Sequence, residues 1–395
     1  MNARRVIILI ALLSVLHNAL RVLALLLGNR WGLFNYLSVV REKPLDAAVL
    51  MEILGLVAVV VLAVLVAGSL WRKSSEPAPL WSSALWAAGA GAGTGLITVY
   101  SSAAAHNYGW ILFVAAPVLV GFISVLALAS HKRVNLRDAL IVSMSSVILL
   151  GGILVAFAIE GAICLVMALP IAIPLAMLGA AIGYASQSRL AEHSPMMFLV
   201  LLGVMPFGAS LERSVQPPAE TFAVTTTLDI PAPPQRVWQT VLRPAKLRPP
   251  SQLLFRAGVA YPLASHIEGS GPAAIRYCDF STGKLVEPVL IWDDLHQLRF
   301  AVASNPLPMQ EWTPYAQIHP PHLDGFLVSR QGEFQLEPLP DGGTRLRATT
   351  WYQHHLWPER YWRWWSDYII HRVHNLVLEN IRDRSSLRET APLFR

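Results

Sequence analysis

Long apolar segments fill the first half of this chain and limit what it can fold into. Crossing a bilayer takes about 20 apolar helical residues. Six predominantly apolar runs reach that length, at residues 6–28, 47–71, 81–105, 110–130, 139–159 and 161–185. A seventh run, 195–211, is shorter and contains Pro206. We expect residues 1–213 to form a multi-span transmembrane bundle of about seven helices.

Charged residues are divided unevenly between the two halves. Residues 1–213 contain 13 Lys/Arg and 8 Asp/Glu, whereas residues 214–395 contain 18 and 17, the share of an ordinary soluble domain. Of the net charge of +6, +5 therefore belongs to the hydrophobic half, where basic residues lie in short loops. This distribution is typical of a membrane protein and argues against nucleic-acid binding, which needs a basic surface on the soluble part.

The basic loop residues also predict an orientation. With the N-terminus in the cytoplasm, the inner loops hold eight Lys/Arg and the outer loops only Arg30, Arg41 and Lys43. Seven spans across a cell (inner) membrane then place the C-terminal domain outside the cytoplasm. If 195–211 only lies on the membrane surface, the domain is cytoplasmic. Arg21 and Glu52 stand at matching depth in the first two spans, and we expect an intramembrane ion pair.

After a Pro-containing linker at 214–221, the pattern changes to that of an α+β domain at 222–390. Alternating apolar residues predict strands at 222–230, 272–281, 284–293, 297–304, 325–337 and 344–355. Two helices are predicted at 234–242 and 358–389, each with a proline near its first turn. The apolar stripe of the long helix consists of Trp362, Trp365, Ile369, Val373 and Leu376. Tyr361 and Trp364 lie off this stripe and could rest on the bilayer or on the bundle.

The order of these elements resembles the helix-grip fold. The segment 230–238 (IPAPPQRVW) is similar to the opening strand-to-helix segment of START-like (SRPBCC) proteins, the superfamily of polyketide cyclases and lipid-transfer domains. Segments that resemble those of bacterial membrane-anchored members are 276–283 (RYCDFSTG), 318–325 (IHPPHLDG), 349–352 (TTWY), 108–110 (YGW) and 160–164 (EGAIC). The resemblance implies an α-helical transmembrane bundle plus an α+β helix-grip (START-like) domain, an antiparallel sheet curled around the long C-terminal helix with a cavity between them. It implies no reaction, because the superfamily hosts both enzymes and binders.

Strand alternation predicts which side chains face that cavity. In 344–355, Tyr352 and His354 share the inner face, and Arg345, Arg347 and Thr349 share the outer one. In 325–337, the apolar residues Phe326, Val328, Phe334 and Leu336 share a face with Arg330. A buried guanidinium needs a partner, and the candidates are Glu287, Asp279 or a ligand carboxylate or carbonyl. Alternatively, Arg330 reaches water at an edge or through a shifted register.

The connection 308–325 is long for a compact sheet and is either a lid or a rigid loop. As a lid, it would place Trp312, Tyr315, His319 and His322 at the cavity mouth, and one of the two histidines could act as a general acid or base. We expect no metal site, because the chain has no His-Glu-x-x-His motif and no cysteine pair. The complete expected pocket is Asp279, Glu287, Trp312, Tyr315, His319, His322, Phe326, Arg330, Phe334, Tyr352 and His354.

The function that this pattern favours is a membrane-tethered module that binds an apolar small molecule or lipid between the sheet and the C-terminal helix. The alternatives are an enzyme of the polyketide cyclase/dehydrase type that uses the same cavity, or a non-catalytic regulatory or docking protein. The sequence has no nucleophile elbow and no phosphate loop, which favours binding over catalysis. No cofactor is expected, and the expected partners are the lipid bilayer and the ligand.

Overall fold

The computed structural model describes residues 80–157, 159–190, 194–215, 218–247, 249–313, 318 and 320–386. The chain divides into two compact units. The first, helical unit comprises Met1–Gln216 and the segment Thr313–Pro320, and the sheet-containing unit comprises Pro217–Trp312 and Pro321–Arg395. The first two apolar runs and the expected pair of Arg21 with Glu52 lie outside the described residues.

The helical unit contains one helix for each of the other five apolar runs. The helices are α4 (Leu80–Ala104), η1 (Ile111–Ala115) running into α5 (Ala116–Ala129), α6 (Leu136–Ala156), α7 (Ala162–Leu190) and α8 (Ser194–Val215). Three stretches among the described residues are long and apolar enough to cross a membrane: Ile111–Ala129, Leu136–Ala156 and Ala162–Leu190. Glycines allow α5 and α7 to cross closely, because a Cβ on Gly179 would lie 1.9 Å from the Val118 carbonyl oxygen.

Two adjacent residues near the end of α8 hold the turn between α4 and α5. The Glu212 carboxylate accepts hydrogen bonds from the backbone N–H groups of Trp110 (2.5 Å) and Ile111 (3.2 Å), at the start of the η1–α5 helix. Arg213 donates to the carbonyl oxygen of Ala105 (2.5 Å), just beyond α4. An acid at a helix N-terminus and a base at a C-terminus both satisfy free backbone groups and oppose the helix dipoles.

The second unit is built on one antiparallel sheet of eight strands, in the order β1-β8-β7-β6-β5-β4-β3-β2. The strands are β1 (Thr221–Ile230), β2 (Ala245–Lys246), β3 (Pro262–Glu268), β4 (Ile275–Phe280), β5 (Gly283–Asp293), β6 (Gln297–Ala301), β7 (Leu327–Pro338) and β8 (Thr344–His354). The strands β2 and β3 were not predicted, because β2 has only 2 residues and β3 combines polar residues with Pro262 and lacks a clear alternation. The other six strands match the predicted segments.

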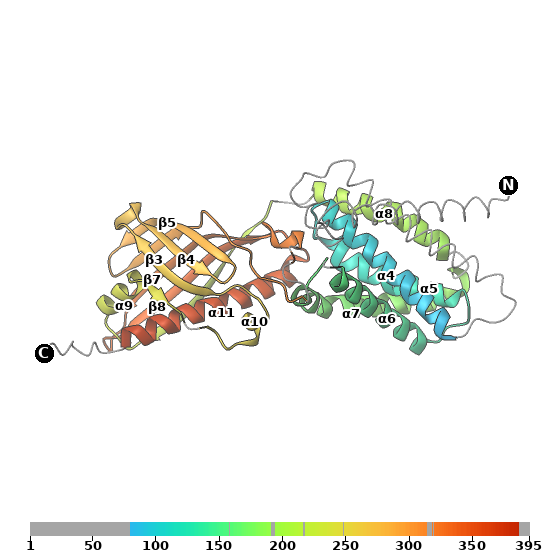
Figure 1. Cartoon of the computed structure of the whole chain (residues 1–395), viewed down its shortest axis with the longest axis horizontal. Helices are drawn as coiled ribbons and strands as arrows, with labels where there is room; N and C mark the ends of the chain where they lie inside the picture. Colours follow the sequence, from blue (N-terminus) through green and yellow to red (C-terminus); the bar gives the residue numbers. More distant parts are fainter. Residues whose placement is uncertain are drawn as a thin grey trace, which may run out of the picture. The chain divides into compact units, whose positions relative to one another are not determined.

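Helices cover the concave side of this sheet. α9 (Pro234–Leu242) follows β1, α10 (Leu253–Arg256) is a single turn, and α11 (Glu359–Ser386) runs along the sheet (Figure 1). The curled antiparallel sheet and the long C-terminal helix together form the helix-grip fold. The predicted apolar stripe of α11 is wrong beyond Trp362: the buried residues are Trp362, Ser366, His374, Leu378, Ile381 and Ser385. Polar residues occupy this inner face because they bond to the sheet or are small enough to approach it closely.

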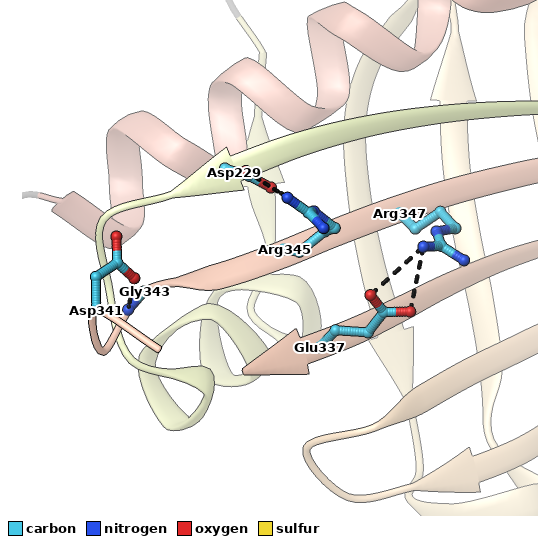
Figure 2. A network of polar contacts seen from close by, with 6 residues as sticks. All are labelled: Asp229, Glu337, Asp341, Gly343, Arg345 and Arg347. Atoms are coloured by element: carbon cyan, nitrogen blue, oxygen red, sulfur yellow. Dashed lines mark hydrogen bonds and ion pairs between the residues drawn. The ribbon is translucent and has the colours of Figure 1, made fainter. Parts of the chain in front are cut away.

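The convex face of the sheet is solvated and carries cross-strand ion pairs, as the alternation in β8 predicted. Arg345 of β8 bonds to Asp229 of β1 through two atoms, at 2.8 and 2.9 Å, and Arg347 pairs with Glu337 of β7 at 3.2 Å (Figure 2). At the β7–β8 hairpin, the Asp341 carboxylate accepts from the Gly343 N–H at 3.0 Å, and Gly342 has a positive φ of 84°. These contacts fix the strand register that decides which side chains face inward.

Candidate functional site

The concave side of the sheet is filled mainly by large apolar side chains. Its buried core includes Trp238 of α9, Leu298 and Phe300 of β6, Phe334 of β7 and Leu378 of α11. Most of the space in which a cavity was expected is therefore filled in this structure, because Trp238, Phe300 and Phe334 occupy it. Phe334 and Tyr352 lie on the inner face, as predicted, with Phe334 within this core.

A buried ion pair interrupts the apolar core. Arg276 of β4 and Glu287 of β5 are directly opposite each other in the sheet, only 7% and 5% exposed, and their side chains are hydrogen-bonded. The Arg276 guanidinium lies 4.9 Å from the ring centre of Phe300 and 5.6 Å from that of Phe334. Two aromatic faces and one carboxylate thus balance the cost of placing this cation inside the domain.

Burial sets the protonation of the groups around Arg276. Desolvation raises the pKa of the Glu287 carboxyl, and the neighbouring Arg276 charge opposes that rise. The pKa of the Cys278 thiol, which shares the inner face of β4, is raised to about 11, again mainly by burial. Cys278 is therefore a protonated thiol at neutral pH and not an activated nucleophile.

Next to this pair, a small cavity lies between the sheet and the C-terminal half of α11. Its volume is about 20 Å³, room for about one water molecule. Its lining consists of Thr240, Val241, Ala245, Leu247, Pro262, Ser265, Arg276, Cys278, Phe334, Val377, Asn380, Ile381 and Arg384. The lining combines apolar side chains with several hydrogen-bonding groups.

Two weak attachments hold the C-terminal half of α11 over this cavity. Asn380 donates to the Lys246 carbonyl oxygen at 3.4 Å, and Arg384 donates to the Pro244 carbonyl oxygen at 3.0 Å. Burial is the main cause that lowers the pKa of Arg384, with the Arg243 charge second. Its Nη1 atom is buried and has no hydrogen-bond partner among the described residues. This end of the helix therefore keeps a guanidinium that is only partly satisfied beside the cavity.

A second set of polar side chains, Tyr352, His354 and Asp367, lies on the inner side of the sheet near the N-terminal end of α11. The Tyr352 hydroxyl donates to the Asp367 carboxylate at 2.5 Å, and the His354 ring stacks against Phe222, 5.4 Å between ring centres. Burial lowers the pKa of His354 to about 4, so the ring is neutral at pH 7. Burial and the Asp367 contact raise the pKa of the Tyr352 hydroxyl above its ordinary range. His354 is inner and buried, as predicted, but no part of the cavity lining.

His374 ties the middle of α11 to the sheet. Its two ring nitrogens are hydrogen-bonded to the hydroxyl groups of Thr226 (2.9 Å) and Thr350 (2.8 Å), on β1 and β8. The Thr226 hydroxyl also bonds to His371 at 2.7 Å. Burial lowers the pKa of His374 to about 4, with the His371 charge as a second cause. These contacts make His374 a structural, neutral imidazole.

The predicted inward position of Arg330 is wrong. A β-bulge between Ser329 and Gln331 leaves Arg330 as the extra residue of β7, exposed and donating to the Gln353 side chain at 2.8 Å. Before the bulge the alternation is reversed, so that Ser329 pairs with the inward Tyr352. Val328 and Phe326, which the uninterrupted alternation placed with Phe334, are consequently shifted off that face.

Other expected pocket residues are scattered. Asp279 lies on the opposite face of β4 from Arg276, half-exposed, with Lys284 3.6 Å away. Trp312 is exposed, Phe326 is half-buried against His355, and His322 lies half-buried in the short turn η4 (Pro321–Leu323). Tyr315 and His319 lie outside the described residues. Of the residues named from the sequence, Glu287 and Phe334 come together at the ion pair.

The sequence did contain a signal for Arg276. β4 and β5 are joined by a short hairpin turn, Ser281-Thr282, which is followed by Gly283 with a positive φ of 147°. Counting back from that turn places Arg276 opposite Glu287, an opposite-charge pair on a face with Cys278 and Leu285. From the sequence, this turn was recognised only as part of the segment 276–283, which resembles one in membrane-anchored START-like proteins. The lining residues of α9 and of the β2–β3 region had no such signal.

No protein-family model matches the chain, and no curated protein matches it either. Solved structures are similar over the sheet-containing part. Norcoclaurine synthase from Thalictrum flavum is 12% identical, with a TM-score of 0.28, over 43% of this chain and 97% of that one. The Zhui aromatase/cyclase from Streptomyces sp. R1128 is 11% identical, with a TM-score of 0.27, over 42% and 94%.

A protein from Chromobacterium violaceum gives a comparable likeness, 15% identity and a TM-score of 0.28, over 42% of this chain and 98% of that one. Identities and TM-scores at this level carry no argument about substrate or reaction.

Proposed function

We propose that this chain is a membrane-tethered binding module, whose helix-grip domain holds a largely apolar small molecule or lipid between the sheet and α11. The observation that carries the proposal is the buried ion pair of Arg276 and Glu287, in which Arg276 lines the cavity. A pair buried this deeply is weak as a source of stability, because hydrophobic residues of similar size would serve the core as well or better. In this proposal the Arg276 guanidinium of the pair binds an oxygen atom of the ligand.

Binding in this space requires α11 to move. The described cavity accommodates about one water molecule, whereas ligand sites usually have volumes of several hundred Å³. The segment of α11 beyond His374 is the element suited to opening. Among the described residues its side-chain hydrogen bonds to the segment around β2 are those of Asn380 to Lys246 and Arg384 to Pro244, and opening would also separate Leu378 and Ile381 from the core. The rest of α11 is held more firmly, because His374 bonds to both Thr226 and Thr350 and Asp367 bonds to Tyr352. In this proposal the ligand enters where Val377, Ile381 and Arg384 now cover the sheet.

Binding is favoured over catalysis by the chemistry of the lining. Among the described residues that line the cavity, the only thiol is Cys278, whose pKa is raised to about 11, and none is a histidine. Acyl or proton transfer would need an activated nucleophile or a base that titrates near neutral pH.

Photo-crosslinking of the full chain tests this proposal. The protein is reconstituted in nanodiscs with a diazirine-bearing fatty acid, irradiated and digested, and the modified peptides are identified by mass spectrometry. We expect modification of the segments around Arg276–Cys278 and Val377–Ile381, and its loss in Ser265→Phe, which fills the cavity. His266→Phe changes the neighbouring residue, whose ring stacks on Tyr277 outside the cavity, and should leave the modification unchanged. Crosslinks confined to the bundle helices in the wild-type chain would contradict the proposal.

A further inference from the structure

We propose that the N-terminal half of α11 carries a membrane-contacting stripe, Arg360, Trp364, Tyr368 and Arg372, that lies in the headgroup region of a bilayer containing anionic lipid. This inference goes beyond the ligand cavity, and it shares with the proposed function only the membrane tether. The four residues are spaced four apart on one side of the helix, facing away from the buried positions Trp362, Ser366 and His374.

The stripe is exposed and ordered by its own contacts. Trp364 and Tyr368 are 60% and 38% exposed, and their rings stack with centres 6.2 Å apart. The Arg372 guanidinium lies 5.1 Å from the ring centre of Tyr368. Exposed tryptophan beside tyrosine and arginine is the residue combination enriched where proteins meet the membrane–water interface, because each side chain has an apolar body and a polar end.

The stripe begins at the end of the domain where the chain enters it. β1 starts at Thr221. The ring centre of its second residue, Phe222, lies 4.6 Å from the guanidinium of Arg363, which precedes Trp364 in the helix. Five residues, 216–220, separate β1 from the end of α8 at Val215. A chain of this length reaches at most about 20 Å. With 195–211 spanning the membrane or lying on its surface, as the sequence predicts, this end of the domain stays within reach of the lipid headgroups.

The charges of this helix face favour anionic lipid. Arg360 and Arg372 are both exposed at the two ends of the stripe. Two acids of the helix lie near the stripe. Glu359, half-buried, precedes Arg360 in the first turn. Asp367 accepts a hydrogen bond from Tyr352 and lies 3.5 Å from Arg363, so its charge is balanced within the domain. The stripe itself contains two arginines and no acid, and this charge favours lipid phosphates.

Fluorescence quenching in the full chain tests the stripe. A dansyl-bearing amino acid is introduced by amber suppression in place of Trp364, or of Glu379 as an exposed control farther along α11. Vesicles of phosphatidylcholine with about a third phosphatidylglycerol carry a doxyl group near the headgroup. We expect at least about twofold more lipid quenching at position 364 than at 379. We also expect Arg360→Gln/Arg372→Gln to reduce quenching at 364 to the level seen in pure phosphatidylcholine.

Two results would overturn the inference. Equal quenching at 364 and 379 would show that the stripe faces water. A probe at 364 that is shielded from both the lipid doxyl group and aqueous iodide would show that Trp364 packs against protein. Neither result depends on ligand binding in the cavity, so failure here leaves the crosslinking experiment to decide the proposed function separately.

Discussion

Arg276 and Glu287 form a buried pair because two neighbouring strands are joined by a short hairpin turn. The turn puts the two residues opposite each other, the inner face removes them from water, and Phe300 and Phe334 flank the cation. Each group is tolerated only because the other is present, since an isolated buried charge is far more costly than a pair.

Removing one partner should therefore be worse than removing both. We expect Arg276→Met to destabilise the domain by about 3–5 kcal/mol and Arg276→Met/Glu287→Leu to recover much of that loss. Chemical denaturation of the purified full chain, followed by tryptophan fluorescence, measures the difference. Arg345→Met, which removes an exposed pair with Asp229, is the control and should change stability little. A double variant as unstable as Arg276→Met would show that the two side chains are not coupled.

The buried histidines should make the domain sensitive to acid. His374 has a pKa of about 4 in the folded chain, and an unfolded histidine titrates near 6.5. The unfolded state then binds the proton first, so stability is complete above about pH 6.5 and falls as the pH is lowered towards 4. The loss should be roughly 3 kcal/mol from His374, with His354 acting in the same direction.

Thermal melts of the full chain at pH 7 and pH 5 measure this dependence. His374→Gln should lower the melting temperature at pH 7, because the bonds to Thr226 and Thr350 are weakened, but should flatten the decline towards pH 5. His296→Gln replaces an exposed histidine and should preserve the wild-type slope. An unchanged slope in His374→Gln would mean that another group causes the acid sensitivity.

At the scale of single elements, β7 shows how one β-bulge determines which side chains of a strand face the core. Its bulge turns Arg330 outward, and two residues later Gly332 lies directly opposite Phe300 of β6. A Cβ on Gly332 would lie 2.3 Å from the Phe300 ring, so the absence of a side chain lets that ring cover the strand. The same ring contacts the Arg276 guanidinium.

Gly332→Ala should consequently disturb the ion pair as well as the sheet. We expect a loss of about 1–3 kcal/mol from the forced movement of Phe300, measured by denaturation. Phe300→Leu should cost stability alone but should relieve the effect of Gly332→Ala in the double variant. Strictly additive losses in the two substitutions would contradict this direct contact.

Strand alternation predicted six of the eight strands, because an inner apolar face and turn residues leave a clear periodic pattern. The helices α9 and α11 were predicted from a proline near the first turn. Strand alternation could not predict the bulges in β5 and β7, since an inserted residue reverses the alternation without a marked change of composition. That reversal explains the error at Arg330. The stripe of α11 was misplaced because Ser366, His374 and Ser385, which face the sheet, do not look like core residues in the sequence.

At the scale of the whole molecule, the chain joins apolar helices to a domain of ordinary charge. We propose that the domain lies outside the cytoplasm, given the bias of basic residues towards the inner loops and a span formed by 195–211. A pair of reporters fused after Arg395, one active only in the cytoplasm and one only outside it, measures the side. Activity of the cytoplasmic reporter alone would mean that 195–211 lies on the membrane surface instead.

The presence of a molecule between the sheet and α11 is tested most directly by native mass spectrometry of the full chain released from membranes. We expect the wild-type chain to retain an extra mass of one small apolar ligand, the His266→Phe control to retain the same mass, and Ser265→Phe to lose it, because the added ring occupies the cavity beside Arg276. Retention of an identical ligand by Ser265→Phe, or a wild-type chain that carries none, would contradict binding at this site.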